Sequence, residues 1–127
     1  ICSLLRISTE NILRNHPHRG SIFENMVVSE IRKSKIHNHL ESELFYWRDK
    51  AEHEVDLIID DGQTLMPIEI KSSMTVPPDG FKNLSWWRNL SGAESSILLY
   101  GGDQYQNRKT GESTMNWRHF LTNFKIK

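Results

Sequence analysis

Two short apolar runs contain charged residues, and this feature constrains the fold of the chain more than any other. The runs are EVDLIID at 54–60 and MPIEIKSS at 66–73, and both have the composition of β-strands. They nevertheless include Asp56, Glu69 and Lys71. A charge in a half-buried strand loses its hydration, so it needs a partner, a metal ion or a function that compensates for the loss.

The composition is that of one soluble globular domain. The chain has 127 residues, of which 25% are charged and 37% are hydrophobic. Sixteen basic residues balance sixteen acidic ones, so net charge alone does not indicate a nucleic-acid-binding protein. Basic residues are more frequent near both ends and acids in the middle. A polarised surface is one interpretation of this distribution, and evenly solvated faces are the simpler one.

The compartment can be inferred from what the sequence lacks. Cys2 is the only cysteine, so an intrachain disulfide cannot form and a reducing compartment fits. No apolar run approaches the ~18–20 residues of a membrane span, and no signal peptide is visible. We therefore expect a cytoplasmic protein. The chain begins at Ile1, and ICSLLRI is typical of an internal segment, so we expect a fragment of a longer polypeptide.

The predicted elements follow the order helix, three strands, helix, strand, helix, which indicates one α/β domain with a mixed sheet. A helix is predicted from Gly20–Ser21 to about residues 35–39, with strands at 44–47, 54–60 and 64–71. An amphipathic helix follows at 81–90, ended by Gly92, and then a strand at 96–100. Residues 103–113 are predicted as a polar loop and residues 115–124 as a last helix.

Strand alternation predicts how the charged residues are arranged. Glu69 and Lys71 are two residues apart, so both face the same way at a spacing of roughly 7 Å. If the turn before them is 61–62, Asp56 lies diagonally across from Glu69, and if it is 62–63, Asp56 faces Glu69 directly. Either register places Asp56 on the face of Glu69 and Lys71, whereas a one-residue bulge would break this arrangement.

These residue types favour metal-dependent chemistry. Neighbouring carboxylates repel each other unless a cation lies between them, and hard oxygen ligands suit magnesium or manganese. The backbone carbonyl of Ile70 offers a further ligand. Such a metal lowers the pKa of bound water, and Lys71 is placed to position that water or to stabilise charge on a phosphate. The alternative is a solvent-exposed face that carries a cross-strand ion pair.

Glu24 has two interpretations. On the first helix it shares a side with Val28 and Ile31, at the border of the apolar face, from which it can reach the sheet. It also lies three residues after Ser21, the spacing of a capping box. The two roles can coexist.

The runs GSIFENMVVSEIRK, LFYWRDKAEHEVDLIID and MPIEIKSS, taken together, resemble the PD-(D/E)XK nuclease-like superfamily. More closely, the chain resembles the uncharacterised C-terminal domain that follows the ATPase module in a family of prokaryotic AAA-type ATPases. The resemblance covers roughly residues 1–100 and implies a restriction-endonuclease-like α-β-β-β-α-β core in residues 20–127. Residues 1–19 would then end a linker from an upstream ATPase module, of which no Walker motif is present here.

The resemblance also assigns roles to six residues. By that resemblance the helix acid is Glu24, the metal-binding acid is Asp56, the E-x-K pair is Glu69 and Lys71, and the substrate-binding residues are Arg48 and Ser72. The implied activity is magnesium- or manganese-dependent cleavage of DNA, or of RNA. Trp86, Trp87 and Trp117 could stack on bases, although Trp87 and Trp117 fit the core better at their helical positions.

Two other functions remain open. Domains of this fold also serve in binding, so the chain could be a non-catalytic nucleic-acid- or protein-binding regulatory domain of the ATPase. It could also be a pure interaction domain whose polar face is only an ion-pair network. The expected partners are DNA or RNA and the ATPase module that binds ATP, without a membrane, and a homo-oligomer is compatible with the sequence.

Overall fold

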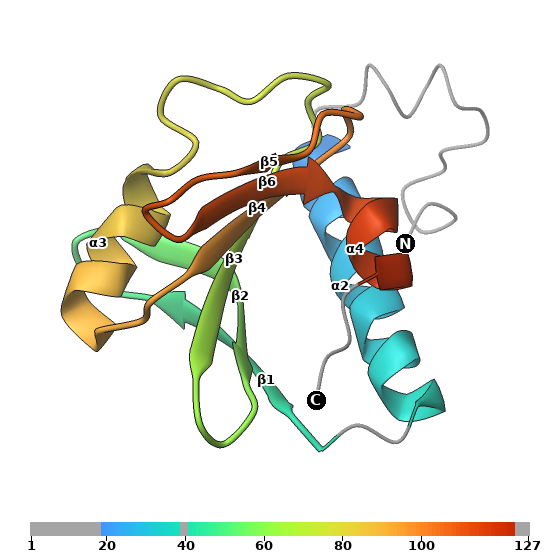
Figure 1. The fold of residues 1–127 in the computed structure, drawn as a ribbon, viewed down its shortest axis with the longest axis horizontal. Helices are drawn as coiled ribbons and strands as arrows, with labels where there is room; N and C mark the ends of the chain where they lie inside the picture. Colours follow the sequence, from blue (N-terminus) through green and yellow to red (C-terminus); the bar gives the residue numbers. More distant parts are fainter. Residues whose placement is uncertain (1–18, 39–40, 124–127) are drawn as a thin grey trace.

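A mixed β-sheet forms the centre of the domain in the computed structural model, which describes residues 19–38 and 41–123 (Figure 1). Within these residues six strands lie in the order β1-β2-β3-β4-β6-β5. They are β1 (Glu43–Arg48), β2 (Glu54–Asp60), β3 (Leu65–Ile70), β4 (Ser96–Tyr100), β5 (Gln106–Asn107) and β6 (Glu112–Asn116). The first three strands pair antiparallel, β4 is parallel to both β3 and β6, and β5 is antiparallel to β6.

Helices cover both faces of the sheet. The helices α2 (Arg19–His37) and α4 (Trp117–Asn123) lie on one face and α3 (Lys82–Ser91) lies on the other (Figure 1). The order α2-β1-β2-β3-α3-β4 confirms the predicted α-β-β-β-α-β order, and the predicted mixed α/β class is correct.

The core is divided by the sheet into two apolar clusters. On the side of α2 and α4 the buried residues are Val27, Ile31, Leu57, Ile59, Ile68, Ile70, Ile97, Leu99, Met115 and Phe120. On the side of α3 they are Val55, Ile58, Leu84, Trp87, Leu98 and Tyr100. All five residues of β4 are buried, because helices cover both of its faces and strands flank both of its edges.

Of the two predictions about helix ends, the one for the start of α2 is wrong and the one for the end of α3 is confirmed. α2 already includes Arg19 and Gly20, so Ser21 is not its N-cap and the capping-box interpretation of Glu24 is wrong. The predicted linker at 1–19 lies outside the described residues except for Arg19. The predicted end of α3 is confirmed, because Gly92 adopts the left-handed conformation (φ 78°) and its N–H donates to the carbonyl of Arg88 at 2.8 Å.

The C-terminal part of the sheet differs from the prediction. Residues 103–113 are not only a loop, because β5 and the start of β6 lie there, and the last helix begins at Trp117 rather than at Met115. The sequence of β6, ESTMN, has a single apolar residue and no alternation. It forms a strand because it pairs in parallel with the buried β4, so tertiary pairing overrides its weak local preference.

A β-bulge interrupts the pairing of β1 with β2. Phe45 pairs with Ile58 and Trp47 pairs with Val55, so three steps along β2 correspond to two along β1. The extra residue in β2 breaks simple alternation. Val55 therefore packs on the α3 side although Leu57, two residues later, packs on the α2 side. Asp56 lies between them, within the bulged segment.

Candidate carboxylate and lysine site

Four of the residues predicted from the sequence come together where α2, β2 and β3 meet. Glu24 interacts with Asp56 and with Lys71, and Asp56 interacts with Glu69 and Lys71. Glu24 belongs to α2, Asp56 to β2 and Glu69 to β3, and Lys71 directly follows β3. A carboxyl group from a helix is thus added to an acid and an acid-x-lysine pair from neighbouring strands.

Asp56 is held against β3 by its side chain. The backbone pairing of β2 with β3 runs from Asp60–Leu65 to Leu57–Ile68, which is the predicted register with its turn at 62–63. Beyond this point the N–H of Ile70 donates to Oδ2 of Asp56 at 2.8 Å. The carboxylate of Asp56 thus accepts the hydrogen bond and has a fixed orientation at the end of the paired segment.

Glu69 is a buried acid with a single described cation beside it. The residue is 5% exposed, and its Oε1 lies 3.3 Å from Nζ of Lys71. Its Oε2 is buried and accepts no hydrogen bond from the described residues. Burying an ionised carboxylate oxygen without a donor is costly, so this oxygen needs either a proton shared with Asp56 or a cation.

The pKa values of all three acids are raised, chiefly by burial. Burial, and then the charge of Asp56, raise the pKa of Glu69 to about 8, while Lys71 opposes the shift. Burial, followed by Asp56, raises the pKa of Glu24 to about 7. Burial also raises the pKa of Asp56, against the hydrogen bond from Ile70. The cluster therefore retains protons near neutral pH that isolated carboxyl groups would lose.

The carboxylates of the cluster meet only part of the usual requirements for binding a hard cation. Across residues 19–38 and 41–123, no group of three or more His, Cys, Asp or Glu side chains is arranged to hold a metal ion. Magnesium, however, commonly binds one or two carboxylates and takes its other ligands from water and substrate phosphates. Asp56 and Glu69 could meet this smaller requirement, and Oε2 of Glu69, which has no hydrogen-bond partner in the described part of the chain, is consistent with it.

The two predicted substrate-binding residues lie at the border of this cluster. Arg48 is the exposed last residue of β1, and its backbone lies opposite that of Glu54 in β2. The charge of Glu54 contributes to the raised pKa of Glu24. The backbone carbonyl of Ser72 accepts a hydrogen bond from Nη2 of Arg19 at 2.9 Å. Arg19 was missed by the sequence reasoning, because an arginine at the start of a helix has no distinctive pattern.

The tryptophans contribute mainly to packing. Trp87 is buried in the α3-side core, and Trp117 packs edge-on against Phe23 with ring centroids 6.2 Å apart. Trp86 stacks on His53 at 3.8 Å with an interplanar angle of 2°. The predicted core placement of Trp87 is confirmed.

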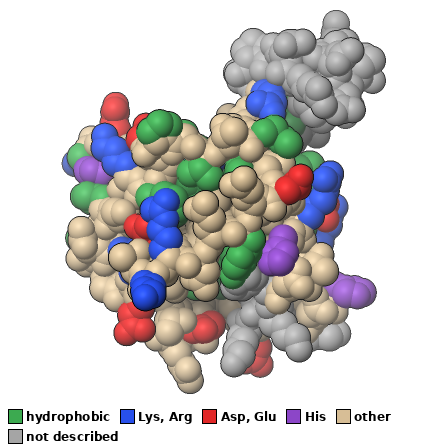
Figure 2. All heavy atoms as spheres, turned by 45° about the horizontal axis from the view of Figure 1, so that its top comes forward, with side chains coloured by type: hydrophobic (Ala, Val, Ile, Leu, Met, Phe, Trp, Pro, Cys, Tyr) green, Lys and Arg blue, Asp and Glu red, His purple; other side chains and the backbone are tan. Residues whose placement is uncertain are grey.

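The surface carries charges of both signs. On the face shown in Figure 2, Lys and Arg side chains are interspersed with acidic and histidine side chains and do not form one continuous basic area. None of the helices in the described ranges is both long and apolar enough to cross a membrane.

The fold and the cluster define a class of protein: a mixed α/β domain with three carboxyl groups and a lysine at the meeting point of a helix and a β-hairpin. The chain belongs to the family described as a domain of unknown function, DUF4143, whose profile matches residues 19–120. No match was found among curated proteins.

Proposed function

We propose that this domain is a nuclease of the PD-(D/E)XK type that hydrolyses phosphodiester bonds of DNA with the help of magnesium or manganese. One observation carries the proposal: beside Asp56, Glu69 has a buried carboxylate oxygen that no described residue hydrogen-bonds, and its other oxygen contacts Lys71. The α-β-β-β-α-β order of the core supports it. We also propose that the domain follows an AAA-type ATPase module in the full-length protein, because its sequence runs resemble that family.

The residues of the site can share the steps of hydrolysis. A bound divalent cation would lower the pKa of a water molecule and neutralise charge on the phosphate. Asp56 and Glu69, with the carbonyl of Ile70, would hold that cation. Lys71 would orient the water or stabilise the phosphate oxygens. Glu24 has a pKa of about 7, so it is suited to accept the proton of the attacking water near neutral pH.

A cleavage assay tests this proposal. With Mg²⁺ or Mn²⁺, we expect the protein to cleave labelled single- or double-stranded DNA, and a chelator to stop the reaction. Lys71→Ala should lower the rate at least 100-fold, the loss typical for one electrostatic contact to a developing charge. Lys82→Ala, an exposed change on α3, is the matched control and should cleave like the unaltered protein.

The nuclease proposal fails if the unaltered protein cleaves neither DNA nor RNA with either metal, or if Lys71→Ala cleaves at the unaltered rate. One alternative is supported by the structural use of the same residues. Asp56 accepts the N–H of Ile70 and Lys71 pairs with Glu69, contacts that also suit a non-catalytic binding domain. Salt-sensitive DNA binding without cleavage would favour that alternative.

A further inference from the structure

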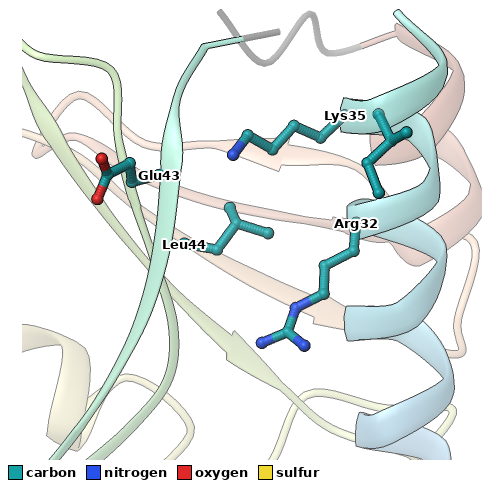
Figure 3. A pocket seen from close by; sticks show the side chains of 5 residues that line it. Arg32, Lys35, Glu43 and Leu44 are labelled. Atoms are coloured by element: carbon teal, nitrogen blue, oxygen red, sulfur yellow. The ribbon is translucent and has the colours of Figure 1, made fainter. Parts of the chain in front are cut away.

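A second candidate site lies between the C-terminal half of α2 and the start of β1. It is a groove of about 370 Å³, lined by Arg32, Lys35, Ile36, Glu43 and Leu44. Figure 3 shows the side chains of Arg32 and Lys35 extending from α2 towards β1, and Leu44 pointing from β1 towards α2. The carboxylate of Glu43 points away from α2 in the same view.

Among the residues that the structure describes, the two cations of this groove have no acidic partner. No ion pair or hydrogen bond joins Arg32 or Lys35 to another described residue, whereas their neighbour Lys33 pairs with Glu30 at 3.4 Å. Lys35 lies in the last turn of α2, where its charge also offsets the helix dipole. Arg32 lies earlier in the helix and has no such role. Two cations that border the same groove, beside the apolar side chain of Leu44, attract an anion.

α2 connects this groove with the carboxyl cluster. Lys35 follows Glu24 by 11 residues, about three helical turns, so both lie on one side of the helix roughly 16 Å apart. On β1, alternation places Tyr46 and Arg48 on the face of Leu44, towards α2. Tyr46 is 74% exposed and lies between the groove and the end of the strand that borders the cluster.

We propose that the groove binds the phosphates of a single-stranded nucleic acid, with a base of that strand stacked on Tyr46. This proposal rests on the proposed function, because it extends the path of the substrate from Asp56 to Arg32 and Lys35. Three of the four side chains in the carboxyl cluster are acidic, so the cations of the groove would add an anchor for the phosphates away from the cluster. Exposed aromatic rings combined with cations are typical of single-strand recognition.

Binding of a fluorescent single-stranded oligonucleotide in the presence of a chelator tests the groove without requiring catalysis. The double variant Arg32→Gln/Lys35→Gln keeps long polar side chains on the helix. We expect its Kd to rise at least 10-fold, and the slope of log K against log salt to become shallower by about 1.4, which is two phosphates at ~0.7 each. Tyr46→Ala should weaken binding of the single strand about 5-fold or more and leave duplex binding unchanged.

The control is Lys33→Gln/Lys82→Gln, which removes two exposed lysines outside the groove and should keep both the Kd and the salt slope. The groove proposal is overturned if the Arg32/Lys35 variant binds like the unaltered protein, or if the unaltered protein shows no salt-sensitive binding. If the groove variant binds more weakly while no metal-dependent cleavage is ever observed, the proposed function fails and the groove remains a binding site.

Discussion

Glu69 lies between Ile68 and Ile70, two residues of β3 whose side chains pack into the α2-side core. Its own side chain is 7% exposed, its Oε1 contacts Nζ of Lys71, and its Oε2 has no hydrogen-bond partner among the described residues. The free energy of unfolding of a protein of this size is only about 5–15 kcal/mol, so an ionised acid at this position lowers stability substantially. A proton on the carboxylate or a bound cation offsets this loss.

We expect the ionisation of Glu69 to make the stability of the protein depend on pH. The pKa of Glu69 is about 8 in the folded protein against 4.5 ordinarily, so its contribution to stability is complete below pH 4.5 and is lost as the pH rises through 8. Glu24, with a pKa of about 7, acts in the same direction. We therefore expect the melting temperature without divalent metal to fall between pH 5 and pH 8.5.

Glu69→Gln removes the ionisation and should weaken this pH dependence, with a gain on the order of 1–3 kcal/mol at pH 8. Differential scanning calorimetry at several pH values measures both effects. Glu30→Gln, a change of a surface acid on α2, is the control and should retain the full pH dependence. If the unaltered protein and Glu69→Gln show the same pH profile, Glu69 does not carry the buried charge described here.

For single residues, the sequence predicts some of the contacts in the site and not others. The common face of Glu69 and Lys71 follows from strand alternation, which is a local rule, and their ion pair confirms it. The hydrogen bond from Ile70 to Asp56 and the contact of Arg19 with Ser72 join residues 14 and 53 positions apart. Such contacts depend on the register of neighbouring elements, which one sequence does not contain.

Among the elements, those with strong local patterns were predicted and β6 was not. β2, β4 and α3 have continuous apolar runs or helical spacing, so their boundaries agree closely with the prediction. β6 is polar in isolation and becomes a strand only because β4 offers it an edge. The sequence indicates a possible bulge between β2 and β3, whereas the structure has its bulge in the pairing of β1 with β2. Its position depends on how β1 pairs with β2, which local patterns do not contain.

Two glycines in helical context should respond in opposite ways to alanine. Gly92 ends α3 at φ 78°, so Gly92→Ala forces a side chain into the left-handed region and should cost about 1–2 kcal/mol. Gly20 lies within α2 with no atom near its missing Cβ, so Gly20→Ala should stabilise by about 0.5–1 kcal/mol. Urea denaturation measures both. Equal effects of the two changes would contradict the assigned helix ends.

For the whole molecule, the arrangement of layers decides where chemistry can occur. α2 crosses the sheet face that carries the α2-side core, and it contributes to both polar regions: Glu24 to the carboxyl cluster, and Arg32 and Lys35 to the groove (Figures 1 and 3). α3 covers the opposite face and contributes to neither region. One helix therefore connects the proposed cation site with the proposed anion site.

The central claim is that Asp56 and Glu69 bind a divalent cation. A crystal soaked in Mn²⁺ at pH 8, examined by anomalous diffraction, tests it most directly, with Asp56→Asn as the control because the amide oxygen can still accept the N–H of Ile70. We predict an anomalous peak within about 2.0–2.3 Å of carboxylate oxygens of both residues in the unaltered protein, and its loss in Asp56→Asn. An unaltered protein without a peak between Asp56 and Glu69 at saturating Mn²⁺ would contradict the account.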